Sequence, residues 1–131
     1  MKVVAIDYGS ARTGVAVSDP SGTIARPLGV VERAATDAGL RRLAELIQAE
    51  EAERVVVGLP LTLRGEHGAQ AQETEVFVEA LAARTDVPVV TFDERFTTDL
   101  AERSPSRVEE DARAAAHLLS SYLEWTSNRR S

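Results

Sequence analysis

The sequence contains no cysteine, few aromatic residues and no long apolar run. Without cysteine the chain forms no disulfide, no thiol nucleophile and no cysteine-ligated zinc site, and such a composition suits a reducing compartment. Apolar stretches such as residues 3–6 are far shorter than the roughly 20 residues of a membrane span. No signal-peptide pattern precedes the first apolar run. We therefore expect a cytoplasmic protein with no membrane partner.

Positive charge is also scarce, since 15 Lys and Arg residues stand against 21 Asp and Glu residues, for a net charge of -6. This balance argues against a protein that coats nucleic acid through bulk positive charge. It leaves room for an enzyme that uses a local basic patch and bound cations. All basic residues except Lys2 are arginines, which bind phosphate in a bidentate manner.

The rest of the composition is that of an ordinary globular protein, with 44% hydrophobic and 27% charged residues in a chain of 131. This length fits one core, and no linker, repeat or low-complexity tract divides it. We expect a single domain over residues 1–131, with a flexible tail from about residue 126.

Apolar runs that end at acids or turn-forming residues predict five strands. They cover residues 2–7, 13–18, part of 24–31, 54–59 and 88–92. The short turns between the first three predict an antiparallel meander.

Three helices are expected after the meander: one capped by Asp37, one over residues 70–84, and one from Ser106 to about residue 125. The expected inward-facing residues of the first two are Leu40, Leu43, Ile47, Val76, Phe77 and Leu81. The order of elements predicts an α/β fold, a mixed five-stranded sheet with helices on both faces.

Acidic residues end two of the buried strands. Asp7 closes the first, and Asp93 and Glu94 follow the last. Functional sites in such sheets form at the carboxyl ends of strands, so these acids are candidates for one rim. A carboxylate at a strand end is also common as a turn former or an ion-pair partner. Strand alternation places Asp93 and Glu94 on opposite faces, and periodicity alone leaves open which one faces the site.

Asp111 is the third candidate acid, because it shares a helical stripe with the apolar residues 115, 118, 119 and 122. A carboxylate on a buried face needs an arginine, a hydrogen-bond donor or a metal as its partner. A favourable interaction with the helix N-terminus is the simpler alternative.

Three converging carboxylates favour a hard cation such as Mg²⁺ or Mn²⁺ over zinc. The two histidines do not change this expectation. His67 lies in a glycine-rich loop and His117 lies off the Asp111 stripe, so both are expected to be exposed to solvent.

Four segments of the sequence resemble one protein family, in that family's order. They are residues 5–19 (AIDYGSARTGVAVSD), 56–61 (VVGLPL), 93–98 (DERFTT) and 111–115 (DARAA). With them the chain resembles the YqgF/RuvX family of ribonuclease H-like proteins, described as Holliday junction resolvases and as pre-16S rRNA nucleases. The resemblance covers residues 1 to about 125.

The resemblance implies a ribonuclease H-like fold with a two-metal site for Mg²⁺ or Mn²⁺. In the matching segments, Asp7, Glu94 and Asp111 stand at the positions of the family's catalytic and metal-binding acids. The resemblance therefore favours Glu94 over Asp93 as the site residue. The implied activity is metal-dependent hydrolysis of phosphodiester bonds in structured nucleic acid. The substrate is either branched Holliday junction DNA or precursor 16S rRNA, and the products carry 5′-phosphate and 3′-hydroxyl ends.

Arg12, Arg64 and Arg95 are candidate phosphate contacts, although Arg12 and Arg95 could equally pair with neighbouring acids. Thr62 and Arg64 stand where the family usually has an asparagine and an acid, and the segment before Asp111 is shorter than is typical. These departures concern contacts to the substrate.

Two other functions share this fold. One is a non-catalytic nucleic-acid-binding module, in which the acids are often lost, whereas all three are present in this chain. The other is an ATP-binding protein, which normally needs two such domains. Within the nucleases, a junction resolvase is expected to be a homodimer, because symmetric cleavage needs two active sites.

Overall fold

The computed structural model describes residues 1–62, 64–96 and 108–129. Its strands are β1 (Val3–Asp7), β2 (Arg12–Ser18), β3 (Ala25–Glu32), β4 (Arg54–Leu59) and β5 (Val89–Asp93). They form one sheet in the order β3-β2-β1-β4-β5. The pairs β1–β2 and β2–β3 are antiparallel, and β1–β4 and β4–β5 are parallel. The predicted mixed five-stranded sheet with its opening meander is confirmed.

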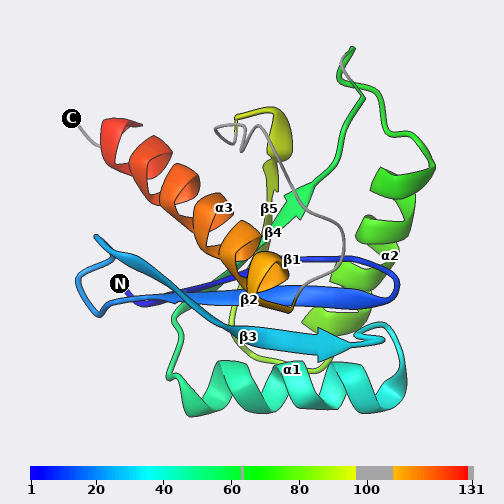
Figure 1. Ribbon diagram of the computed structural model, residues 1–131, viewed down its shortest axis with the longest axis horizontal. Helices are drawn as coiled ribbons and strands as arrows, with labels where there is room; N and C mark the ends of the chain where they lie inside the picture. The colour runs from blue at the N-terminus through cyan, green and yellow to red at the C-terminus, as the bar shows by residue number, and fades with distance from the viewer. Residues whose placement is uncertain (63, 97–107, 130–131) are drawn as a thin grey trace.

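Helices cover both faces of this sheet, as expected (Figure 1). α1 (Asp37–Ala49) and α2 (Ala69–Ala82) pack on one face, and α3 (Val108–Arg129) crosses the other. A short 3-10 helix, η1 (Glu94–Phe96), follows β5. No helix within the described ranges combines the length and the apolarity that a membrane crossing requires.

Alternation along β1 divides the core into two layers. Val4 and Ile6 pack toward α1 and α2, whereas Val3 and Ala5 pack toward α3. Both faces of the strand are therefore buried, which explains its continuous apolar run. By the same alternation, Asp7 at the end of β1 lies on the α3 side of the sheet.

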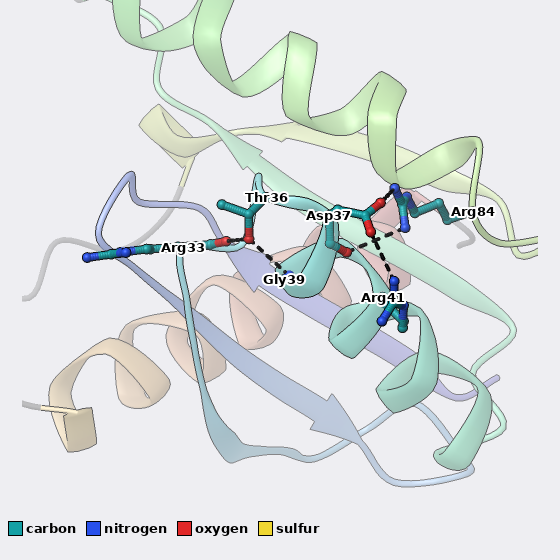
Figure 2. Close-up of polar contacts among 6 residues, drawn as sticks. All are labelled: Arg33, Thr36, Asp37, Gly39, Arg41 and Arg84. Atoms are coloured by element: carbon teal, nitrogen blue, oxygen red, sulfur yellow. Dashed lines mark hydrogen bonds and ion pairs between the residues drawn. The ribbon is translucent and has the colours of Figure 1, made fainter.

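Thr36, and not the predicted Asp37, caps α1. Thr36 has an extended backbone, and its Oγ1 accepts a hydrogen bond from Gly39 N at 3.1 Å. Asp37 is the first residue of the helix and pairs with Arg41 and Arg84 (Figure 2). The hydrogen bond from Arg84, which follows α2, is the main reason why the pKa of Asp37 is lowered. This contact joins the start of α1 to the end of α2.

Thr36→Ala is expected to lower the free energy of unfolding by about 1 kcal/mol, because Gly39 N loses its acceptor. Urea denaturation measures the change. Thr36→Ser keeps the hydroxyl and is the matched control, which is expected to stay close to wild type. An unchanged midpoint for Thr36→Ala would contradict the assignment of the cap.

Two helices differ from the prediction in detail. Val76 of α2 was expected to face inward but is 67% exposed, because the buried face consists of residues three or four positions apart. These residues are Ala71, Thr74, Phe77 and Leu81. α3 continues to Arg129, so residues 126–129, predicted as a tail, are helical. The predicted cap at Ser106 lies outside the described residues.

Candidate functional site

Asp7 and Glu94 line one pocket of about 280 Å³ at the sheet edge where β1, β4 and β5 have their carboxyl ends. The other lining residues come from the β1–β2 turn, from the end of β4 and from α2. They are Tyr8, Gly9, Ser10, Pro60, Gln70, Glu73 and Thr74. The structure therefore brings together two acids that lie 87 positions apart (94 − 7) in the sequence.

Glu94 approaches Asp7 across a glycine of β4. A Cβ atom on Gly58 would lie only 2.9 Å from Glu94 Oε1, so the missing side chain leaves space for this carboxylate. Phe92, two residues before Glu94, packs under α3 in the same layer as Ala5. Asp7 and Glu94 thus share the α3 side of the sheet.

Asp93, the acid that periodicity left as an alternative, has a different environment. Its Oδ2 lies 2.6 Å from Arg95 Nη2 and accepts a second hydrogen bond from Arg95 Nε at 2.9 Å. These bonds lower the pKa of Asp93 despite its partial burial. Asp93 is held as the partner of Arg95 and does not line the pocket.

The backbone of α3 at Asp111 lies close to β2, across a second glycine. A Cβ atom on Gly14 would lie 1.9 Å from the carbonyl oxygen of Asp111. Gly14 is the β2 partner of Asp7, so α3 begins directly above the strand next to that acid. Only the absence of a side chain at Gly14 allows this approach.

The Asp111 side chain points to Arg12 and does not line the pocket. Its Oδ2 lies 2.9 Å from Arg12 Nε, and 32% of the side chain is exposed. Asp111 is therefore less buried than its helical stripe predicted. Its apolar stripe is as expected, since Ala115, Leu118, Leu119 and Tyr122 are all buried.

A divalent cation fits this site by the chemistry of its donors. Asp7 and Glu94 supply carboxylate oxygens, the ligands that Mg²⁺ and Mn²⁺ prefer. Asp111 Oδ2 is buried and forms an ion pair with Arg12, but among the described residues it accepts no hydrogen bond of good geometry. Within the described residues no three acidic or histidine side chains are already placed to hold an ion. Asp111, the third candidate acid, is paired with Arg12 in this structure.

The three arginines that were predicted to contact phosphate differ in their partners. Arg12 and Arg95 both pair with acids, which is the alternative that the sequence left open. Arg95 also packs on the loop after β4. A Cβ atom on Gly65 in that loop would lie 3.2 Å from Arg95 Nη1. Arg64 is exposed in the same loop.

The histidines take no part in the pocket. His67 is exposed, as expected, and its Nδ1 lies 2.8 Å from Glu75 Oε1. His117 was expected to be exposed but is half-buried on α3.

Several pocket residues were missed by the sequence analysis. Tyr8 and Ser10 directly follow Asp7, so their position in the chain was a usable signal. Gln70 and Glu73 looked like ordinary solvent-facing residues of a helix, and only the docking of α2 brings them to the pocket.

Known proteins resemble this chain over nearly its whole length. The family described as RuvX, Holliday junction resolvase, matches residues 1–125. A relative from Desulforudis audaxviator is 41% identical over 133 aligned residues, covering 94% of each chain. One from Chloroflexus aggregans is 40% identical over 135, covering 96% of this chain and 95% of the relative. Both names assign those proteins provisionally as pre-16S rRNA nucleases.

Solved structures show the same fold. Thermus thermophilus RuvC in complex with a Holliday junction substrate has a TM-score of 0.62 and 21% identity, covering 97% of this chain and 96% of RuvC. The fowlpox virus Holliday junction resolvase has a TM-score of 0.55 and 13% identity, covering 95% and 99%. The fold is ribonuclease H-like, as the resemblance implied. By its family match and its similarity to these relatives, the chain belongs to the RuvX family.

Proposed function

We propose that this protein is a nuclease that hydrolyses phosphodiester bonds in structured nucleic acid, with Asp7, Glu94 and Asp111 as its catalytic acids. The observation that carries the proposal is the meeting of Asp7 and Glu94 in one pocket, with Asp111 anchored beside Asp7 across Gly14. The RuvX family match supports the same chemistry.

We propose Mg²⁺ or Mn²⁺ as the cofactor. Such an ion, when bound, lowers the pKa of an attacking water and stabilises the leaving oxygen. Asp7 and Glu94 would hold it from the pocket, and Asp111 would join them on leaving Arg12. We propose that Arg12 then exchanges this carboxylate for a phosphate oxygen of the substrate.

Basic residues in η1 and in the loop after β4 support binding of a phosphate backbone. The Arg95 guanidinium, from η1, lies against Gly65, and the exposed Arg64 precedes Gly65 in the loop after β4. We propose that these two arginines contact phosphates on one side of the cleaved bond. Because the protein carries a net charge of -6, this local patch is expected to make few contacts and to give a shallow salt dependence.

Two candidate substrates are consistent with this activity, precursor 16S rRNA and Holliday junction DNA. The relatives are named for precursor 16S rRNA, whereas the RuvX family and the solved structures are described by Holliday junctions. A junction resolvase needs two active sites and is expected to sediment as a two-fold dimer, whereas an rRNA nuclease has no such requirement.

The deciding experiment is a cleavage assay on both substrates with Mg²⁺ and with Mn²⁺, together with sedimentation with and without junction DNA. We expect cleavage of at least one substrate that depends on the divalent ion. A monomer that trims only the RNA would reject the resolvase. Binding of nucleic acid without any cleavage would favour the non-catalytic module.

A further inference from the structure

The pocket has two chemically different ends. Asp7 and Glu94 lie at one end, where the proposed chemistry takes place. Tyr8 and Glu73 lie at the other, against α2. A volume of about 280 Å³ is close to the lower limit of small-molecule sites, so the pocket has room for a group larger than a metal ion and its waters.

Tyr8 is held as a flat platform on this second end. Its ring stacks on Phe77 with centroids 4.3 Å apart and an interplanar angle of 19°. Phe77 is only 1% exposed and belongs to the core beneath α2, so the stack fixes one face of the Tyr8 ring. Tyr8 is itself half-buried, and it also lines the pocket.

The charge of this end disfavours a phosphate. Glu73 Oε1 lies 3.5 Å from the Tyr8 hydroxyl and places a carboxylate at this end. Burial and the Glu73 carboxylate together raise the pKa of Tyr8, so the hydroxyl remains protonated. None of the described lining residues is basic. An acceptor-only carboxylate suits an amino or hydroxyl group, which a base or a ribose carries.

We propose that Tyr8 and Glu73 form a nucleoside subsite that receives one unpaired nucleotide beside the cleaved phosphate. The base would stack on the Tyr8 ring, and Glu73 would accept a hydrogen bond from a base amino group or from the ribose 2′-hydroxyl. Stacking on an aromatic side chain is open only to a base that has left its neighbours. The subsite therefore selects strands that are unpaired at the cleavage point over fully paired arms. The inference rests on the proposed nuclease function only for the position of the phosphate.

Binding measured in EDTA tests this subsite without any cleavage. The probes are a short fluorescent RNA strand and a DNA strand of the same sequence. Each is used as a single strand and as a duplex with its complement. Tyr8→Leu keeps apolar packing on Phe77 but removes the flat ring, so its Kd for single strands is expected to rise about tenfold. Tyr8→Phe keeps the ring and is expected to stay within about twofold of wild type. Binding of the duplexes is expected to be unchanged in both variants.

Trp125→Leu is the matched control, because Trp125 is a partly exposed aromatic residue that packs on Phe92, away from the pocket. Its single-strand binding is expected to equal wild type. Thermal melts show that each variant is folded. The proposal would be overturned if Tyr8→Leu bound single strands with the wild-type Kd, or if its Kd rose equally for single strands and for duplexes.

Glu73→Ala tests whether Glu73 contacts the base amino group or the ribose 2′-hydroxyl. Glu79→Ala, on the exposed side of α2, is its control. A loss on RNA alone assigns the contact to the ribose, and equal losses on RNA and DNA assign it to the base. No loss on either probe would overturn the role of Glu73. Cleavage by an Asp7 variant would reject the proposed function and leave these binding results standing.

Discussion

Asp7→Asn is expected to lower the cleavage rate by on the order of 10³-fold, the size of effect seen when a charge-stabilising group is removed from an active site. Asp7 is the central acid, because it ends β1 between β4, against which Glu94 lies at Gly58, and β2, against which the Asp111 backbone lies at Gly14. Asparagine has nearly the same volume but lacks the charge that a divalent cation needs. Single-turnover cleavage measures the rate.

Thermal melts of Asp7→Asn separate loss of chemistry from loss of fold. Wild type is expected to melt at a higher temperature with Mg²⁺ or Mn²⁺ than with EDTA, since a bound ion offsets repulsion between the acids. The variant is expected to lose this rise and to melt in EDTA at or above the wild-type temperature, because the neutral amide removes part of the repulsion. Asp86→Asn is the control, because Asp86 is an exposed aspartate that precedes β5. It lies at the amino-terminal end of that strand, away from the carboxyl ends where the pocket is. Normal cleavage by Asp7→Asn would disprove the site.

Gly14→Ala is expected to lower the free energy of unfolding by about 3 kcal/mol and to abolish cleavage. The new methyl group would lie 1.9 Å from the carbonyl oxygen of Asp111 and 3.2 Å from Ala112 N. Both atoms belong to the backbone of α3, so relief requires the whole first turn to move away from β2. Asp111 would move with it, away from Asp7. Urea denaturation and the cleavage assay measure the two effects.

Two other glycines provide a graded comparison. Gly29→Ala is the control, because no atom of the described residues lies within 4 Å of its Cβ position. Gly58→Ala would meet the Glu94 side chain at 2.9 Å, which rotates more easily than a helix shifts. We expect Gly58→Ala to lose activity with little loss of stability. Equal stability of Gly14→Ala and Gly29→Ala would contradict the close packing of α3 on β2.

The strands were predictable because their burial leaves a strong local pattern. Residues 54–59 form β4 as predicted, since a strand buried on both faces needs a continuous apolar run. Helix ends were less certain. Thr36 and Asp37 are both good capping residues, and only the hydrogen bond to Gly39 N decides between them. Val76 likewise satisfied an apolar pattern that the buried face of α2 does not use.

The candidate acids were partly predictable. Asp7 and Asp111 stood out because a charge adjoins or interrupts an apolar pattern, and burial of an unpaired charge is costly. The choice between Asp93 and Glu94 needed the family resemblance. The structure places Glu94 on Gly58 in the pocket and pairs Asp93 with Arg95, but the catalytic role of Glu94 remains our proposal.

The sequence by itself determined the elements, the mixed sheet and the two acids that break an apolar pattern, because these depend on periodicity within a few residues. The tertiary structure alone decided which distant groups meet. No local pattern assigns a function to Gly14 or Gly58, yet their missing side chains let the α3 backbone at Asp111 approach β2 and leave space for Glu94 beside β4. Gln70 and Glu73 reach the pocket only because α2 packs on Tyr8 through Phe77. Such contacts between distant segments depend on packing, and no local pattern in the chain records them.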